Sequence, residues 1–526
     1  MRILVCDGLH EAGLDLLLAT EGIEVDTPDQ WSMEQIASQL SNYEAMVVRS
    51  RTKVTAEMLD HAPRLKAIGR AGTGVDNIDI PSASIRGILV MNTPGANAMA
   101  AAEHTMALML ALARHVPQAD QSIREGRWEK KRFMGTELYE HTLGILGLGR
   151  IGSLVAERAI CMGMEVIAHD PYMTPEATAG LGVAWVELEE LFGRSDFITL
   201  HTPRTKETEH IINRSTIAKM RPGARIINCA RGGLIDEEAL YEAIKSGHVA
   251  GAGLDVFSSE PPVNNPLVSL ENVIVTPHLG ASSIQAQASV ARTIASQLIS
   301  YLKDGMIRNA VNFPSVSSKA YDKLYPYLAL AEKLGLLQGQ INTTIERLEI
   351  EYSGPDLEEL PIEPITQTAV KGFLEPVLSE KVTLVNASIL LDQRQIKLVT
   401  STTSENRGYP GTITVKATGK EQESSASGTV FPGEGARLIR LNTYRLEAEL
   451  EGINLIIQNL DTPGVIGLIG RTLGDFHVNI ANMHLSRTPE RDRAMSIIRI
   501  DEEAPDQALE TLREHPHIIS VQQVRL

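Results

Sequence analysis

Three side chains suited to proton transfer and anion binding follow three successive apolar segments in the middle of the chain: Arg231, Glu260 and His278. A histidine exchanges protons near neutral pH, and a carboxylate on its other ring nitrogen fixes the tautomer and raises its basicity. An arginine grips a planar carboxylate through two parallel hydrogen bonds. Each residue alone fits a surface ion pair or a turn, but together the three predict a catalytic site.

The apolar segments before these residues must place them on one edge of a sheet. Each segment has the length and character of a buried strand: Arg225–Asn228, Gly253–Val256 and Val273–Thr276, with Phe197–Leu200 before them. Ligands of an open α/β sheet bind beyond the carboxyl ends of its strands. The three side chains are therefore expected beside whatever ligand this sheet binds.

A glycine-rich turn upstream indicates that ligand. Gly147-Leu-Gly149-Arg150-Ile151-Gly152 follows the apolar run Thr142–Leu146 and opens a helical pattern over 153–162. Its glycines permit a tight turn, a close approach to a pyrophosphate and helix packing, while the helix N-terminus faces the phosphates. The next strand, Val166–Asp170, ends in an acid that would bind the adenosine ribose and repel a 2′-phosphate. We therefore expect the cofactor NAD rather than NADP.

Basic residues also lie at strand ends nearer the N-terminus: Arg49, Arg51 and Lys53 after Ala45–Val48, and Arg70 after Leu65–Ile68. Gly72 and Gly74 would expose backbone N–H groups to an anion there. In a chain with a formal charge of −17, this placement favours phosphate or carboxylate binding over a merely solvated face. A second basic run, Arg124–Arg132, is equally well explained as a solvated helix face.

Composition limits the classes of function. The acidic balance argues against nucleic acid and membrane surfaces as partners. Three cysteines without a CxxC motif argue against a disulfide framework or a thiolate zinc site, and no other metal site is predicted. A strand at the start of the chain and no signal peptide, together with the cysteine usage, favour a cytoplasmic location. The most apolar stretch, 98–113, carries Glu103 and His104 and is expected to be a buried helix.

The element pattern predicts four domains in an α/β chain. Two doubly wound Rossmann-like lobes come first: a flavodoxin-like substrate-binding lobe (1–97 plus 284–307) and an inserted NAD-binding lobe (98–283). The helix 284–302 is expected to return to the first lobe. Period-two strands over 311–450 predict an α+β intervening domain, with 401–411 and 419–428 as exposed turns. Residues 452–526 have the βαββαβ order of a ferredoxin-like domain.

These motifs resemble the D-isomer-specific 2-hydroxyacid dehydrogenases over residues 1 to about 305. The matching segments are Gly147–Gly152 with Asp170, Asn228–Gly233, Ser259–Pro262 and Thr276–Gly280. Segments 48–53, 69–77, 92–97 and 133–137 are similar to members that oxidise 3-phospho-D-glycerate to 3-phosphohydroxypyruvate, the first step of L-serine biosynthesis. The tail resembles the intervening and ACT domains of the long members. The resemblance implies that His278 is the acid–base, Glu260 its partner and Arg231 the carboxylate anchor.

The resemblance also implies ligand contacts, with Asp255 bonding the nicotinamide carboxamide. Expected cofactor contacts are Thr73, Gly147, Gly149, Arg150, Ile151, Gly152, Asp170, Thr202, Cys229, Ala230, Arg231, Asp255, His278, Gly280 and Ala281. Expected substrate contacts are Arg49, Ser50, Arg70, Gly72, Asn97, Arg231 and His278. His104 is expected only to pack or to lie at an interface, and Thr202 is a better cofactor contact than His201.

The C-terminal loop Asn459–Gly464 has two interpretations. Asp461, followed by a proline, is expected to cap the next helix. The ACT resemblance implies instead that paired ACT domains bind L-serine through Asn459 and Asp461, with Asn479 of the partner subunit. A homodimer or homotetramer is expected. The resemblance implies that the segment with Lys131 and Arg132 packs across the dimer, where either residue could reach the partner's active site; a solvated helix face explains this segment equally well. Two alternatives remain: a dehydrogenase for another 2-hydroxy acid such as glyoxylate or glycolate, and an NAD-sensing binding module.

Overall fold

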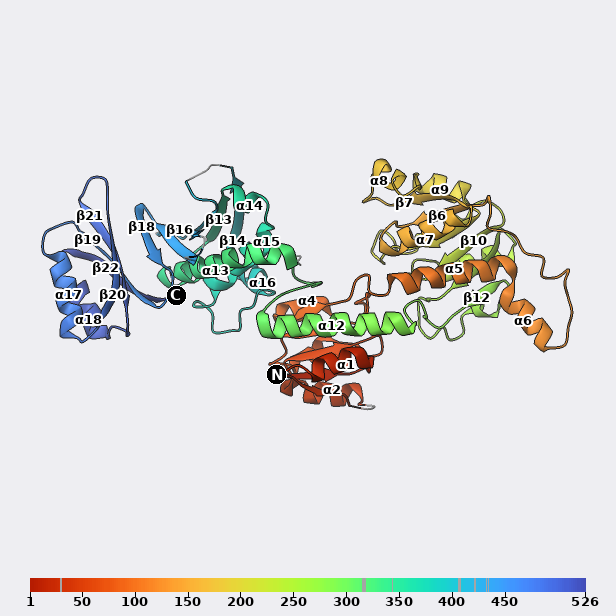
Figure 1. Ribbon diagram of the computed structural model, residues 1–526, viewed down its shortest axis with the longest axis horizontal. Helices are drawn as coiled ribbons and strands as arrows, with labels where there is room; N and C mark the ends of the chain where they lie inside the picture. The colour runs from red at the N-terminus through yellow and green to blue at the C-terminus, as the bar shows by residue number, and fades with distance from the viewer. Residues whose placement is uncertain are drawn as a thin grey trace.

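The structure, a computed structural model, describes residues 1–28, 31–314, 318–342, 344–404, 408–420, 422–431, 433 and 435–526. Their strands form four sheets, which follow one another along an elongated molecule (Figure 1). The two N-terminal sheets are wholly parallel and the last is antiparallel. The predicted fold class, two Rossmann-like lobes followed by an α+β domain and a ferredoxin-like domain, is confirmed.

The first lobe is a five-stranded sheet in the order β2-β1-β3-β4-β5, a flavodoxin-like arrangement. Its strands are β1 (Arg2–Val5), β2 (Glu24–Asp26), β3 (Ala45–Val48), β4 (Ala67–Arg70) and β5 (Leu89–Met91). Its helices are α1 (Glu11–Leu18), α2 (Met33–Gln39), η1 (Leu40–Asn42), α3 (Ala56–Asp60), α4 (Ile80–Ile85) and, from later in the chain, α12 (Ile284–Asp304). The predicted return of α12 is seen in its packing against α1 and β4 (Figure 1).

The second lobe is a seven-stranded sheet in the order β12-β11-β10-β9-β6-β7-β8. The strands are β6 (Thr142–Leu146), β7 (Glu165–His169), β8 (Ala184–Trp185), β9 (Phe197–Leu200), β10 (Ala224–Asn228), β11 (Val249–Leu254) and β12 (Val273–Val275). The helices are α5 (Ala98–Arg114), α6 (Val116–Arg124), α7 (Arg150–Cys161), α8 (Pro175–Ala179), α9 (Leu188–Arg194), α10 (Arg214–Ile217), α11 (Glu237–Lys245) and η2 (Pro266–Ser269). Strand order reverses between β6 and β9, where such sheets bind ligands.

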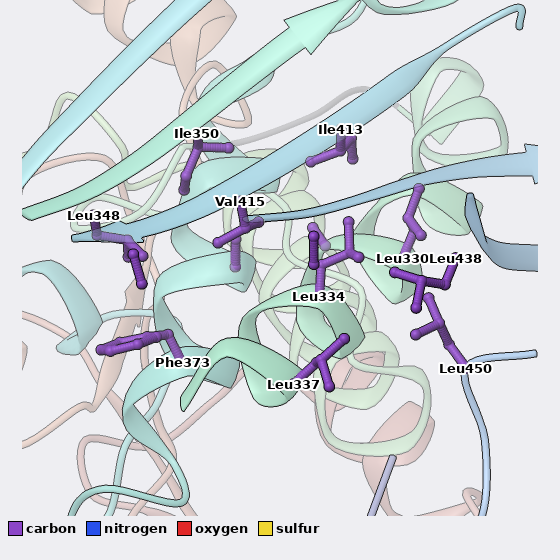
Figure 2. Close-up of a cluster of buried hydrophobic side chains, with 14 of the residues drawn as sticks. Leu330, Leu334, Leu337, Leu348, Ile350, Phe373, Ile413, Val415, Leu438 and Leu450 are labelled. Carbon is purple, nitrogen blue, oxygen red and sulfur yellow. The ribbon is translucent and has the colours of Figure 1, made fainter. Parts of the chain in front are cut away.

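The third sheet has the order β14-β13-β15-β16-β17-β18 and packs on helices (Figure 2). Its strands are β13 (Arg347–Ser353), β14 (Lys397–Thr403), β15 (Thr412–Thr418), β16 (Glu423–Phe431), β17 (Gly435–Leu441) and β18 (Tyr444–Glu449). Its helices are α13 (Ser318–Ile341), α14 (Pro355–Glu358), α15 (Ile362–Leu374) and α16 (Ala387–Gln393). Leucines of α13 face Leu348, Ile350 and Val415 of the sheet (Figure 2).

Two segments of this domain that were predicted to be exposed turns are so only in part: residues 408–411 and 419–420 do lie outside the strands. Residues 401–403 end β14, and 423–428 belong to β16; residues 405–407 and 421 lie outside the described part. Ser424, Ala426 and Ser427 are buried, and β16 packs against α13. Small polar side chains fit this close helix–sheet contact, which composition alone does not reveal.

The C-terminal sheet is antiparallel in the order β20-β21-β19-β22, as the βαββαβ pattern predicted. Its elements are β19 (Ile453–Leu460), α17 (Val465–Asp475), β20 (Ile480–Arg487), β21 (Arg493–Ile500), α18 (Asp506–Arg513) and β22 (Ile518–Arg525). Helices α17 and α18 cover one face of this sheet. From the sheet, Ile456, Met495 and Val524 also pack into the core of the preceding domain. No helix in the described ranges is long and apolar enough to cross a membrane.

Candidate active site

The carboxyl ends of β10, β11 and β12 bring together two of the predicted catalytic side chains in direct contact. His278 Nδ1 lies 2.8 Å from Glu260 Oε2, and Glu260 Oε1 accepts a hydrogen bond from the Phe257 amide at 3.2 Å. His278 has a left-handed backbone conformation, with φ +56°. Since Nδ1 is engaged by Glu260, Nε2 is the ring nitrogen available to exchange a proton with a ligand.

Electrostatics prepare this pair for proton transfer. The hydrogen bond to Glu260 raises the pKa of His278, while partial burial and the charge of Arg231 oppose that shift. Partial burial favours the neutral form of Glu260, but the bond and charge of His278 and the Phe257 amide together outweigh it and lower the pKa of the carboxyl. Glu260 is therefore ionised and makes His278 a stronger base.

Arg231 connects the two lobes. Its Nε lies 3.3 Å from Asp76 Oδ2 of the first lobe. Arg231 packs closely against the backbone of Gly74: a Cβ at position 74 would lie 2.5 Å from Arg231 Nη2. Asn228 shapes the turn from the other side: it donates to the Arg231 carbonyl at 2.9 Å and accepts from the Ala230 amide at 3.0 Å. The guanidinium is thus held at the boundary between the lobes.

A cluster of positive charge faces the same boundary. Burial and the nearby charges of Arg231 and Arg49 lower the pKa of Arg70 to about 10. The Nε of Arg70 is buried and has no hydrogen-bond partner. Arg70 is the last residue of β4, which runs two residues further than predicted. Cations that depress one another's pKa create a site that favours an anion.

Arg51, predicted to join this cluster, instead contacts residues at the carboxyl end of β1. Its Nε lies 3.2 Å from Asp7 Oδ1, and its Nη2 donates to the Cys6 carbonyl at 2.7 Å. Asp7 also accepts from the amides of Arg49 and Thr52. The second basic run is similarly paired: Arg124 with Asp120, Arg127 with Glu125 and Glu129, and Arg132 with Glu129 and Glu271.

The glycine turn has the shape that a dinucleotide pyrophosphate requires. Gly147 has φ +89°, and a Cβ on Gly152 would lie 2.1 Å from the Gly147 carbonyl oxygen. A Cβ on Gly149, in contrast, would have no atom within 4 Å, so this position opens onto free space. Helix α7 starts directly after it, and no side chain caps its N-terminus. The residues present therefore fit NAD.

The remaining predicted cofactor residues surround this turn. Asp170 follows β7 and accepts hydrogen bonds from the amides of Leu148 at 2.8 Å and Tyr172 at 2.9 Å. Thr202 Oγ1 is buried beside Gly147 and has no hydrogen-bond partner. Burial raises the pKa of the Cys229 thiol to about 12, so it stays protonated. Across the boundary, Thr73 Oγ1 donates to Asn97 Oδ1 at 2.9 Å.

Sequence reasoning missed the contact made by His104. Its Nε2 lies 3.2 Å from Asp255 Oδ1 and 3.1 Å from Thr276 Oγ1. Asp255 is fully buried, and its predicted contact with the nicotinamide carboxamide stays a prediction. The signal available in the sequence was the adjacent polar pair Glu103–His104 within an otherwise apolar helix.

The loop Asn459–Gly464 does not cap the following helix as one of the two interpretations predicted. Helix α17 begins at Val465 after Gly464, with no capping side chain, so the prediction that Asp461 caps it was wrong. The positive φ of Gly464, +97°, turns the chain into the helix, and Asp461 pairs with Arg487 at 3.1 Å. Asn459 is buried with its Oδ1 unpartnered, and Asn479 donates to Asp501 at 2.6 Å.

Comparisons with known proteins place these features in a family context. Three family models match: the NAD-binding domain of D-isomer specific 2-hydroxyacid dehydrogenases (106–280), the D-3-phosphoglycerate dehydrogenase intervening domain (323–442) and the ACT domain (453–517). D-3-phosphoglycerate dehydrogenase of Synechocystis sp. is 43% identical over 96% of this chain and 91% of its own length. The enzyme of Methanocaldococcus jannaschii is 42% identical over 100% of both. D-lactate dehydrogenase from Aquifex aeolicus, solved with NAD and lactic acid, covers 60% of this chain and 100% of its own, with 30% identity and a TM-score of 0.53.

Proposed function

Because this chain belongs to the D-3-phosphoglycerate dehydrogenase family, we propose that it oxidises 3-phospho-D-glycerate to 3-phosphohydroxypyruvate with NAD, the first step of L-serine biosynthesis. The observation that carries this proposal is the His278–Glu260 pair beside the charges of Arg231 and Arg70. The full-length match, both C-terminal domains included, speaks against the two alternatives, a glyoxylate or glycolate dehydrogenase and an NAD-sensing module.

Each side chain has a distinct task in the proposed reaction. NAD, held by the glycine turn 147–152 and Asp170, would supply the acceptor for the hydride at C2 of the substrate. Arg231 holds the substrate carboxylate, and His278 Nε2 takes the proton of the C2 hydroxyl. Glu260 stabilises the imidazolium that results, as the carboxylate of a triad does. Arg49 and Arg70 bind the phosphate, assisted by backbone N–H groups near Ser50 and Gly72.

The proposal is tested by following NADH absorbance with 3-phosphoglycerate, glycolate and D-lactate as separate substrates. We expect 3-phosphoglycerate to have the highest kcat/KM by at least one order of magnitude, because a bound phosphate adds charge-assisted hydrogen bonds worth about 1.5–3 kcal/mol each. Equal turnover of the unphosphorylated acids would favour the alternative dehydrogenase, and NADH binding without turnover of any of them would favour the sensing module.

Replacing Glu260 by glutamine should move the pH profile. Oxidation requires neutral His278, so its rate rises as the pH passes upward through the His278 pKa, which Glu260 raises. Glu260→Gln removes that charge, so the acidic limb of kcat/KM should shift to lower pH and the plateau should fall. Glu190→Gln, on the surface of the same lobe and paired with Arg194, is the matched control. An unshifted acidic limb would separate Glu260 from the proton transfer.

Replacing Arg70 by glutamine should change the substrate preference. The loss of one charge-assisted contact to phosphate should lower kcat/KM for 3-phosphoglycerate about 10-fold or more. Glycolate has no phosphate, so its slower turnover should change little. The ratio of the two kcat/KM values is the measurement, and Arg124→Gln, on the exposed helix α6, is the control. An equal loss for both substrates would contradict a phosphate site at Arg70.

We also propose that L-serine regulates the enzyme through paired ACT domains, with Asp461 binding the amino group and Asn459 and Asn479 contacting the effector. The ACT match and the buried, unpartnered Oδ1 of Asn459 support this proposal. Serine inhibits only if it binds one conformation better, and substrate must then weaken serine binding equally. Assays with and without L-serine, for the native protein and Asp461→Asn, test it: inhibition that survives in the variant would contradict it.

A homo-oligomer is proposed from the exposed apolar side chains of α6 and the segment after it. Val116, Ile123, Trp128 and Met134 are each more than half exposed. Clusters of this kind mark protein–protein contacts, here between two copies in which Lys131 or Arg132 reaches the partner's active site. A cytoplasmic location is proposed as well, in agreement with three free cysteines and no disulfide among the described residues.

A further inference from the structure

The turn that carries His278 is held by one buried carboxylate. Asp255 Oδ1 accepts from the Leu279 amide at 2.7 Å and from Thr276 Oγ1 at 2.6 Å, and its Oδ2 accepts from the Gly280 amide at 2.8 Å. The His278 amide donates to the Asp255 carbonyl at 3.0 Å. Asp255 therefore sets the left-handed backbone of His278 and, with it, the direction of the imidazole.

His104 supplies a donor to this carboxylate from a separate element. The other donors belong to residues 276–280, whereas His104 lies on α5, which packs against α7 and β11. Burial raises the pKa of Asp255, but the bonds from His104, Thr276 and the two amides outweigh it and leave the carboxyl ionised. An ionised carboxylate only accepts hydrogen bonds, so the His104 Nε2 that faces it must carry a proton.

This contact ties the position of the catalytic turn to the wall of the cofactor lobe. The side chain of Asp255 has no exposed surface and that of His104 is 20% exposed, so little water competes for the bond. Without His104 the carboxylate would keep only partners that move together with the turn. The turn would then be free to shift relative to β6 and α7, which carry the glycine motif.

We propose that His104 is a positioning residue for the dehydrogenase reaction: acting through Asp255, it fixes the position of His278 relative to the bound substrate. This inference rests on the proposed function, because it concerns the rate of the same reaction. A misplacement of about 1 Å at a reacting group costs up to about 100-fold in rate. Most of the residues proposed to bind the cofactor and the substrate, including the glycine motif and the arginines, lie outside this turn, so the loss should fall more on kcat than on KM.

Two variants distinguish the effect of the His104 hydrogen bond from the effect of the volume that its ring fills. Glutamine carries an amide N–H near the position of Nε2, while phenylalanine fills the site without a donor. We expect His104→Phe to lower kcat about 10- to 100-fold, with KM for 3-phosphoglycerate and the Kd of NADH within twofold of the native values. His104→Gln should recover at least a third of the native kcat. Glu103→Gln, exposed on the same helix, is the matched control.

The outcome separates this inference from the proposed function. Native turnover of 3-phosphoglycerate tests the proposed function, and the ratio of variant to native kcat tests His104. If the native enzyme prefers another 2-hydroxy acid, the ratio is measured with that acid. A native kcat in His104→Phe, equal losses in both His104 variants, or a loss confined to KM would each overturn the positioning role.

Discussion

His278→Asn should reduce NADH formation from 3-phosphoglycerate about 1,000-fold, within the 10²–10⁴ range that general acid–base groups contribute. Asparagine is chosen because it tolerates the left-handed backbone, φ +56°, that His278 adopts. The variant therefore loses the imidazole without straining the turn. Since the glycine motif and Asp170 are untouched, NADH should bind as in the native protein, which fluorescence titration measures.

The matched control for this variant is another histidine in the same lobe. His210 also has a positive φ, +50°, is exposed on the surface, and is not one of the predicted site residues. His210→Asn makes the same chemical change in the same backbone conformation, and its kcat should stay within twofold of the native value. If His278→Asn kept more than a tenth of the native rate while His210→Asn behaved as expected, His278 would not be the base.

The elements of the site were predictable because parallel sheets obey a strong rule. Strand length and apolar character identified β10, β11 and β12, and the carboxyl ends of parallel strands share one edge. By this rule, the sequence alone predicts that His278 and Glu260 lie near each other. Gly147 and Gly152 likewise reflect steric limits of this strand–turn–helix unit, whereas Gly149 leaves open space for a ligand.

Contacts between distant segments were not predictable in this way. His104 and Asp255 are separated by 151 positions, and their meeting depends on how α5 packs over β11. Arg51 has the charge of a phosphate ligand, but Asp7, 44 positions earlier, competes for it. The Asp461 side chain could have capped α17, but Gly464 turns the chain and Arg487 lies within reach. In each case several hydrogen-bond or ion-pair partners were possible, and only the folded structure determines which one is used.

The core that joins the third domain to the ACT domain bears on regulation. Ile456 and Val524 of the ACT sheet belong to the same buried cluster as Leu450, and Arg499 pairs with Glu451 at 2.7 Å. The third domain in turn contacts the substrate lobe, where Thr383 Oγ1 donates to the Gly87 carbonyl at 3.2 Å. Gly87 lies two residues before the start of β5. These contacts connect the ACT domain, where we propose that L-serine binds, through the third domain to the substrate lobe.

Arg231→Lys should lower kcat/KM for 3-phosphoglycerate about 10- to 100-fold, because lysine keeps the charge but cannot form the paired hydrogen bonds, worth about 1.5–3 kcal/mol each, that a carboxylate accepts from arginine. Part of this loss in kcat/KM could also come from the ion pair between Arg231 and Asp76, which joins the two lobes at 3.3 Å. That contribution must be measured separately.

Asp76→Asn removes that ion pair and leaves the guanidinium in place, so it measures the contribution of lobe contact alone. We expect this variant to lose less than fivefold, as an exposed ion pair contributes only about 0–1 kcal/mol. Asp76 is well exposed, with 71% of its side-chain surface accessible, which supports the small value. A loss in Asp76→Asn as large as in Arg231→Lys would mean that Arg231 acts by closing the lobes. A large loss in Arg231→Lys alone would leave the substrate carboxylate as its partner.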